Sequence, residues 1–143
     1  MSTYAGRRDL ARLLMPTWRA LLEIEARRCG ENGLTHWHYI VLADVHEHPD
    51  SAQKEIARRI VRSPSRLATD VEDLCSRDLL SRTSARQDRR INRLNLTPDG
   101  RALTRRVRRQ IHLDEDRLLH RLTTPERDRL RDLLTRALDP EII

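Results

Sequence analysis

Four arginines and two aspartates lie in one short stretch, ARQDRRINRLNLTPDG at positions 85–100, where they could contact a charged ligand. Its second half alternates apolar and polar residues over 91–96, which is typical of a β-strand, and a partner strand is expected over 79–83. The charged residues between these strands then occupy the tip of a hairpin, which is exposed to solvent and needs no arginine for folding. We therefore expect this tip to reach a negatively charged partner. The charged residues of the tip are Arg86, Asp88, Arg89 and Arg90.

The distribution of charge along the chain also favours a polyanionic partner. The net charge is +6, and residues 51–110 carry 16 Lys and Arg against 7 Asp and Glu, whereas the remainder carries 12 against 15. Because Lys54 is the only lysine, part of this excess reflects a general preference for arginine. The concentration of positive charge in the middle of the chain is typical of a nucleic-acid-binding module inside a larger scaffold.

The composition limits the class of protein. A length of 143 residues suits one domain or one subunit of a dimer, and a chain without Phe and with 3% aromatic residues must build its core from Leu, Ile, Val and Ala. Such a core favours packed helices over a β-sandwich. The two cysteines form no CxxC motif, no run of 18 apolar residues occurs, and the first residues lack the apolar region of a signal peptide. We expect a cytoplasmic protein without a membrane segment.

A helix-turn-helix pattern precedes the hairpin. Ser51 is expected to cap a short helix, and Val61–Arg62 forms the tight turn after it. Ser63 then caps a second helix with Pro64 at its first position, where the missing N–H costs nothing. The residues that the first helix turns inward are Ile56, Ala57 and Ile60.

The second helix should bury one face and expose another. Leu67, Val71 and Leu74 recur at helical spacing, so the start of the helix exposes short polar side chains and an arginine. The major groove of DNA admits such a helix, and a hairpin arginine can enter the adjacent minor groove. The residues that we predict to contact DNA are Ser51, Arg62, Ser63, Ser65, Arg66 and Thr69, with Arg86, Asp88, Arg89 and Arg90 of the hairpin.

The hairpin carries a known signature. Asp88–Arg90 followed by Leu94–Gly100 matches a DxR motif and then LxLTxxG. With LTHWHYIVL at 34–42 and the helix-turn-helix pattern between them, the chain resembles the MarR family of winged-helix transcription regulators over almost its whole length. The resemblance implies that Arg90 enters the minor groove and that Asp88 orients it.

Three positions depart from the family pattern. Asp78 stands where the family usually has glycine, and this position can require left-handed backbone geometry, which Asp tolerates moderately well. Pro64 and Arg66 stand where small hydroxyl residues are common. The fold therefore carries over from the family, whereas the DNA sequence that the family members bind does not.

The expected fold is mainly α-helical with a small β-hairpin wing, in a single subunit over 1–143. The resemblance implies a winged helix-turn-helix lobe at 34–100 and a helical dimerisation region at 7–30 and 100–140. Further helices are expected over 7–28, with a kink or late start at Pro16, over 36–47, after Thr97–Pro98, and from Thr124–Pro125. The predicted function is a repressor that binds a pseudo-palindromic double-stranded operator as a homodimer and is released by a small-molecule effector.

The effector prediction concerns the one aromatic-rich patch, His36–Tyr39. Members of the family often hold small anionic or phenolic ligands between the dimer helices and the winged lobe, and this patch opens the helix beside that place. A small aromatic or anionic effector is therefore predicted. The candidate residues are Trp18, His36, Trp37 and His38.

Alternative functions remain open at this point. A zinc-responsive regulator of the same fold is one alternative, although the spacing defines no metal site. Its candidate ligands are His36, His38, His46 and His48 with Cys29 and Glu25. A thiol-redox-responsive regulator that uses Cys29 is another, whereas Cys75 is expected to be a small buried residue. A winged helix that binds protein or RNA is another alternative. We predict no enzyme and no cofactor, because GxSxG, GxxxxGK[ST], HExxH and GxGxxG are absent from the sequence. The run Asp114–Asp116 is expected to be a solvated helix face.

Overall fold

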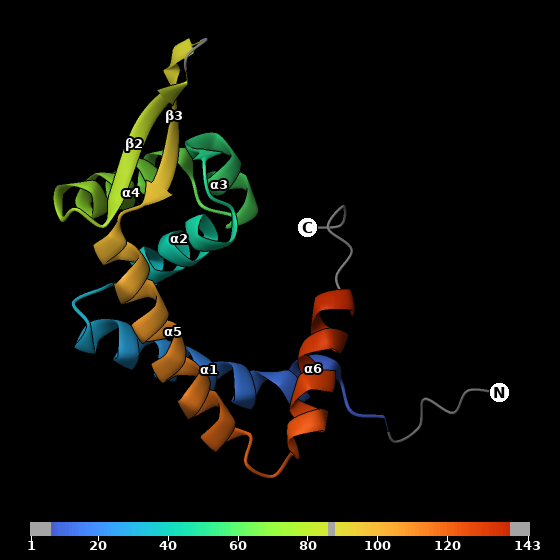
Figure 1. Cartoon of the computed structure of the whole chain (residues 1–143). Helices are drawn as coiled ribbons and strands as arrows, with labels where there is room; N and C mark the ends of the chain where they lie inside the picture. Colours follow the sequence, from blue (N-terminus) through green and yellow to red (C-terminus); the bar gives the residue numbers. More distant parts are fainter. Residues whose placement is uncertain (1–6, 86–87, 138–143) are drawn as a thin grey trace.

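The computed structural model describes residues 7–85 and 88–137, with the backbone alone for 84, 85 and 88–91. It is mainly helical with a small antiparallel sheet, as predicted (Figure 1). In chain order the elements are α1 (Leu10–Glu31), α2 (His36–Glu47), β1 (Ser51–Ala52), α3 (Gln53–Arg59), α4 (Pro64–Ser76), β2 (Leu80–Ala85), β3 (Asp88–Leu96), α5 (Pro98–Leu118) and α6 (Thr124–Ala137).

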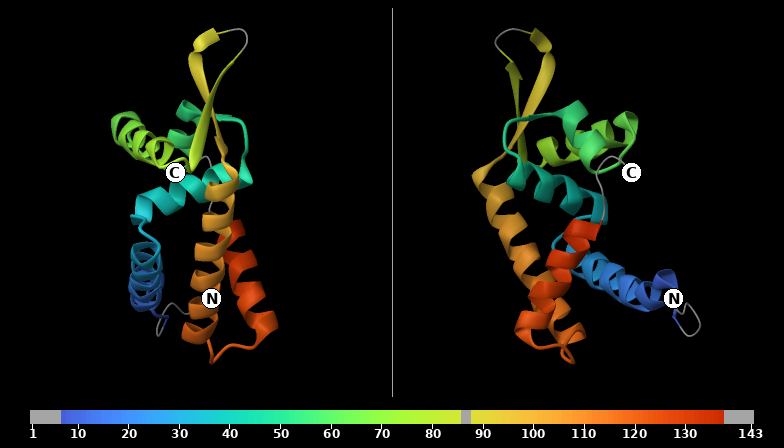
Figure 2. Two further views of the ribbon diagram at one scale, coloured as in Figure 1. Left: turned by 60° about the vertical axis from the view of Figure 1, so that its left-hand side comes forward. Right: turned by 90° about the vertical axis from the view of Figure 1, so that its right-hand side faces the viewer.

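The sheet has the strand order β1-β3-β2, and both pairings are antiparallel. Leu80 of β2 pairs with Leu96 of β3, and Ser51 of β1 pairs with Leu94. The β2–β3 hairpin projects beyond α3 and α4, on the side away from α1 and α6 (Figures 1 and 2). The hairpin is therefore a wing anchored at its base by the short strand β1.

One apolar core holds the helix-turn-helix and the wing together. The inner face of α4 is fully buried, as the spacing predicted, and it packs with residues from α2, α3, β3 and α5. The fully buried aliphatic side chains of this core are Val41, Leu42, Val45, Ile56, Leu67, Val71, Leu74, Leu94 and Val107. Because α2, α3, α4, β3 and α5 all contribute to it, this core holds α4 and the wing in fixed positions relative to each other.

Three helices end in the same backbone motif. The residue after the C-cap has a positive φ in each case: Gly33 at 71°, Val61 at 54° and Asp78 at 55°. After α4, for example, Asp78 N–H donates to Cys75 O and Leu79 N–H donates to Leu74 O, which is the Schellman pattern. The left-handed geometry anticipated at Asp78 is thus present.

The junction between the wing and α5 depends on a close backbone approach. The backbone of Gly100, in the first turn of α5, lies against the Leu79 carbonyl, and a Cβ on Gly100 would overlap that oxygen. Thr97 caps α5 by accepting from Gly100 N–H at 2.9 Å, and its hydroxyl donates to Asp78 O at 2.6 Å. The Thr and Gly of the LTxxG motif therefore tie the end of α4 to the start of α5.

Some predicted element bounds were wrong. Helix α1 begins at Leu10, runs through Pro16 and continues past Cys29 to Glu31. Ser51 does not cap α3, because it lies in β1 and the N-cap is Ala52. Strand β3 begins at Asp88, so the predicted loop over 86–90 is shorter than expected.

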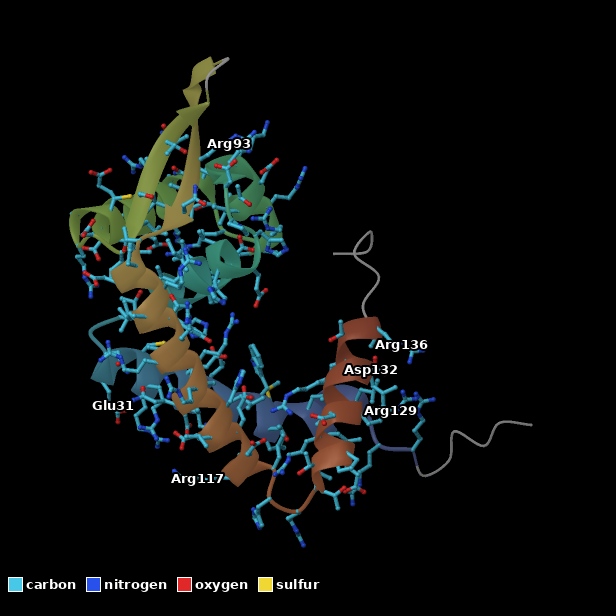
Figure 3. All side chains as sticks on the ribbon, viewed as in Figure 1. Glu31, Arg93, Arg117, Arg129, Asp132 and Arg136 are labelled. Atoms are coloured by element: carbon cyan, nitrogen blue, oxygen red, sulfur yellow. The ribbon has the colours of Figure 1, made fainter. Side chains whose placement is uncertain are left out.

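The remaining helices form an extended stem. Helices α1 and α5 pack together, whereas α6 stands apart from the winged lobe (Figures 1 and 2). None of the fourteen described residues of α6 is buried, and ion pairs from Arg129 and Arg136 to Asp132 run along its outer side (Figure 3). No helix within the described ranges is long and apolar enough to cross a membrane.

Candidate nucleic-acid interface

The start of α4 presents the short polar side chains that were predicted there. Ser63, Ser65, Arg66 and Thr69 are all exposed, while Leu67 holds the opposite face in the core. Ser63 occupies the N-cap position, but within the described chain its hydroxyl makes no capping hydrogen bond. The Thr69 hydroxyl donates to Ser65 O at 3.2 Å, so its lone pairs and methyl group remain available to a ligand.

Two arginines near this face have opposite environments. Among the residues that the structure describes, no carboxylate pairs with Arg66. The Arg62 side chain is only 13% exposed, and its Nε donates to Asp70 Oδ2 at 3.0 Å. Its guanidinium also lies 4.0 Å from the centre of the Trp37 ring. The Arg62 side chain is thus engaged inside the lobe, and its contact with DNA stays a prediction.

Ser51, also predicted to contact DNA, is engaged inside the lobe as well. The residue is buried in β1, its hydroxyl donates to His48 O at 2.8 Å, and it accepts from Arg59 Nη2 at 2.9 Å. Arg59 in turn forms a bidentate pair with Asp44, at 3.0 and 2.7 Å. Ser51 thus belongs to a polar network that joins α2, β1 and α3.

The wing residues can be placed only in part. Asp88, Arg89 and Arg90 lie at the start of β3, next to the hairpin tip, but their side chains lie outside the described parts of the structure. Arg86 lies outside the described residues altogether. Lower on the wing, Arg93 Nη1 donates to Asp50 O at 2.8 Å (Figure 3). That bond fixes the base of the wing to the loop before β1.

The far half of α4 is acidic. Glu72 Oε2 lies 2.9 Å from Arg82 Nη2 of β2, and Asp73 Oδ2 lies 3.4 Å from His38 Nε2 of α2. Both carboxylates lie on the exposed side of the helix beyond Thr69. Because carboxylates repel phosphate, a nucleic-acid backbone is favoured only near the first two turns of α4.

The structure adds two cations that sequence reasoning missed. Lys54 and Arg58 are exposed one turn apart on α3, the first helix of the helix-turn-helix, and neither has a partner among the described side chains. Such a helix lies across the DNA backbone in helix-turn-helix proteins. Lys54 and Arg58 are four residues apart and flank the buried Ile56 and Ala57, and this spacing could have predicted two exposed cations on α3 from the sequence.

The stem holds an apolar groove of about 620 Å³ between α1, α5 and α6. Trp18, 56% exposed, lines one side, and Leu130 and Leu134 of α6 line the other. Further large apolar side chains of the stem are exposed on the same helices: Leu10, Leu13, Leu14, Met15, Leu113, Leu118 and Leu133. Within the described residues the winged lobe has only Val61 in this category.

An ion cluster fixes α1 against α5. The buried Asp114 carboxylate accepts from Arg28 Nε at 2.7 Å, from Arg27 Nη2 at 2.9 Å and from Arg117 Nη1 at 3.1 Å. Hydrogen bonds from Arg28, and then from Arg27, lower the pKa of Asp114 to about 2, although burial opposes the shift. Arg28 also pairs with Glu31 at 2.9 Å; Figure 3 labels Glu31 and Arg117. The prediction of a fully solvated face at Asp114–Asp116 was therefore wrong for Asp114.

Comparisons with known proteins agree with this architecture. A model of the MarR family matches residues 32–91. CouR, a transcriptional repressor solved with a 23-mer DNA duplex, is 26% identical with a TM-score of 0.78, covering 94% of this chain and 96% of that one. The match to the family model identifies the winged helix-turn-helix lobe of this chain as MarR-like. Wild-type MarR from E. coli, in its apo form, is 18% identical with a TM-score of 0.80, covering 94% and 99%.

A further MarR-family structure comes from Mycobacterium tuberculosis. In complex with DNA it has a TM-score of 0.77 at 23% identity, covering 93% of this chain and 100% of that one. The same protein has been solved with salicylic acid, with a TM-score of 0.73 at 24% identity and coverage of 94% and 99%. At 23% and 24% sequence identity, the similarity to this protein shows only that the two chains share a fold.

The four predicted effector residues have different surroundings. Trp18 lines the stem groove, whereas Trp37 stacks on Arg62 in the lobe. His36 Nδ1 lies 3.0 Å from Glu25 Oε2, whose pKa is raised by burial and lowered to a lesser extent by His36. His38 Nδ1 accepts from Thr35 N–H at 3.3 Å, completing the capping box of α2. A shared effector site of these residues stays a prediction.

The metal and redox alternatives gain little support. No group of three or more potential ligands that could hold a metal ion occurs among the described residues. Burial raises the pKa of Cys29 to about 11, with a smaller contribution from Glu25, and burial also raises the pKa of Cys75. Redox-sensing thiols need a lowered pKa, because the thiolate is the reactive form.

Proposed function

We propose that this protein is a sequence-specific transcription regulator of the MarR family that binds double-stranded DNA through the start of α4. The observation that carries the proposal is the contrast between two nearby arginines. Arg62 is neutralised inside the lobe, whereas Arg66 is exposed and unpaired among the described side chains. With Ser63, Ser65 and Thr69 it offers hydrogen-bonding groups suited to base edges in the major groove. Lys54 and Arg58 supply phosphate contacts in this proposal.

The wing is proposed as the second contact. The resemblance of Asp88–Arg90 to the DxR signature supports Arg90 in the minor groove, oriented by Asp88, with Arg86 and Arg89 on phosphates. A nearby carboxylate would normally weaken binding to DNA. If Asp88 orients Arg90, Asp88→Ala weakens binding instead, as Arg90→Ala does by about 1–3 kcal/mol.

The protein is proposed to act as a homodimer through α1, α5 and α6. The exposed apolar residues of these helices and the groove beside Trp18 support this, because a monomer would leave a large apolar surface in water. A two-fold dimer presents two α4 helices to a pseudo-palindromic operator. In this proposal the winged lobe spans 34–100, and the dimerisation region comprises 7–30 and 100–140.

We further propose that the protein represses transcription and that a small-molecule effector releases it from the operator. CouR is a transcriptional repressor, and the M. tuberculosis protein binds salicylic acid in its crystal structure. A small aromatic or anionic effector that favours a different stem arrangement would separate the two α4 helices from their half-sites. Release of a bound operator by salicylate, monitored by fluorescence anisotropy, tests this part with the chemically related benzyl alcohol as the uncharged control.

Selection of duplexes from a random pool tests the proposed function directly. The expected result is a pseudo-palindromic consensus with half-sites about 10 bp apart. A winged helix that binds protein or RNA is the alternative, and it needs neither the exposed Arg66 nor a consensus. Recovery of duplexes without any shared sequence would contradict the proposal and favour that alternative.

A further inference from the structure

Val61 occupies a backbone position that suits its side chain poorly. It follows the C-cap of α3, where its φ is 54°, and Arg62 N–H closes the motif on Ala57 O at 2.9 Å. The equivalent residues after α1 and α4 are Gly33 and Asp78, both of which tolerate this conformation better. A β-branched residue with positive φ is a strained outlier, and the left-handed conformation costs an L-residue free energy.

Burial does not compensate this strain. Val61 is 74% exposed, more than any other large hydrophobic residue within the described ranges. A glycine here would relieve the backbone strain, and no buried contact would be lost. Strained residues of this kind cluster at functional sites, and an observed outlier justifies a functional hypothesis.

Val61 lies next to other exposed groups at the start of α4. It lies in the turn between α3 and α4, two residues before the exposed Ser63. Pro64 and Ala68 on α4 are also exposed, so apolar groups accompany Arg66 at the start of the helix. In the major groove the apolar feature that distinguishes one base pair from another is the C5-methyl group of thymine.

We propose that Val61 is a specificity-determining residue that packs on a thymine methyl group at the edge of each operator half-site. The inference rests on the proposed function, because it requires that α4 enters the major groove. The strained side chain is not explained by folding, and the hydrogen-bonding residues of α4 would not make this apolar contact. It also predicts that each selected half-site contains a thymine whose methyl group contributes to affinity.

Replacement of thymine by uracil tests the contact without changing any hydrogen-bonding group. The selected duplex is synthesised with dT or with dU at each half-site thymine in turn, and its affinity for the wild type, Val61→Gly and Val61→Asn is measured. For the wild type, replacement of dT by dU at one particular thymine of each half-site should lower affinity. The expected decrease is about fourfold for each methyl group removed, as for one buried methyl group. Both variants should bind the dT duplex more weakly and be indifferent to dU at that position.

Thermal unfolding of the same variants completes the test. Val61→Gly should unfold at a higher temperature than the wild type while binding the dT duplex more weakly. The inference would be overturned if dU lowered affinity equally in the wild type and both variants, or if dU had no effect at any position. In either case, specific binding of the dT duplex would still support the proposed function. Failure of the wild type to select any consensus would instead contradict the proposed function itself.

Discussion

The Arg62 guanidinium and the Asp70 carboxylate form a nearly buried ion pair, with Nε 3.0 Å from Oδ2 and the two side chains 13% and 11% exposed. Asp70 lies on α4, and Arg62 lies in the turn before it. The Trp37 ring of α2 covers the guanidinium at 4.0 Å. The ion pair joins the turn to α4, and the Trp37 contact joins the same arginine to α2, so together they set the direction in which the neighbouring polar residues point.

Loss of the Asp70 carboxylate should destabilise the protein. Asp70→Ala leaves a nearly buried arginine without its partner, so the free energy of unfolding should fall by about 3 kcal/mol. Urea denaturation followed by circular dichroism measures this change. Arg66→Ala is the matched control, because it removes an exposed, unpaired arginine and should change stability by less than about 0.5 kcal/mol. Equal effects of the two variants would show that the pair has no structural role.

Two glycines should respond in opposite directions to alanine. Gly100→Ala places a Cβ on the Leu79 carbonyl and should destabilise by about 3 kcal/mol, because backbone atoms have little room to move. Gly30, inside α1, has nothing within 4 Å of an added Cβ, and Gly30→Ala should stabilise by about 0.5–1 kcal/mol. The midpoints of urea denaturation compare the two variants. A Gly100→Ala variant as stable as the wild type would contradict the close approach.

The Asp114 cluster should confer stability that is lost in acid. Its folded pKa of about 2 lies below the ordinary value of about 3.9, so the ionised carboxylate stabilises the folded state above pH 4. This contribution should fall as the pH decreases from about 4 to 2. Unfolding temperatures of the wild type and Asp114→Asn, measured from pH 6 to pH 2, should therefore converge in that range. A constant difference between them at all pH values would contradict the assignment.

The proposed dimer should depend on the apolar stem. Leu134→Glu and Trp18→Asp each place a charge in the groove between α1 and α6, where a partner would have to bury it. Both variants should sediment as monomers at micromolar concentration, whereas the wild type should sediment as a dimer. Arg136→Glu, on the ion-paired outer side of α6, is the control and should remain dimeric. A monomeric wild type would refute the dimer proposal.

Much of the fold could be predicted because local signals agreed with the tertiary structure. The spacing of Leu67, Val71 and Leu74 gave the buried face of α4, and Thr97–Pro98 gave the start of α5. Asp78 was expected to adopt left-handed geometry and does so. Each of these features depends on residues close together in the chain, which is why the sequence alone sufficed.

The surroundings of several polar residues could not be predicted, because their partners are distant in sequence or were overlooked. Arg62 and Ser51 were expected to contact DNA, yet Asp70, Trp37 and Arg59 engage them inside the lobe. Likewise, Asp114 lies beside Arg27 and Arg28 of α1 only because α1 and α5 pack together. Charge patterns show that a residue is polar, but they do not show which polar group it will meet.

Recognition of the operator by α4 is tested most directly by the affinity of Arg66→Ala and Thr69→Ala for the selected operator and for a scrambled duplex at several salt concentrations. Arg106→Ala, an exposed arginine of α5, controls for loss of one positive charge. Both α4 variants should lose affinity mainly for the operator. The difference in binding free energy between the operator and the scrambled duplex should therefore decrease, by about 1–3 kcal/mol for Arg66→Ala. Loss of a phosphate contact would instead weaken binding to both duplexes and reduce the salt slope by about one unit. If both α4 variants lose affinity equally for the two duplexes, α4 does not recognise the operator sequence and the account is contradicted.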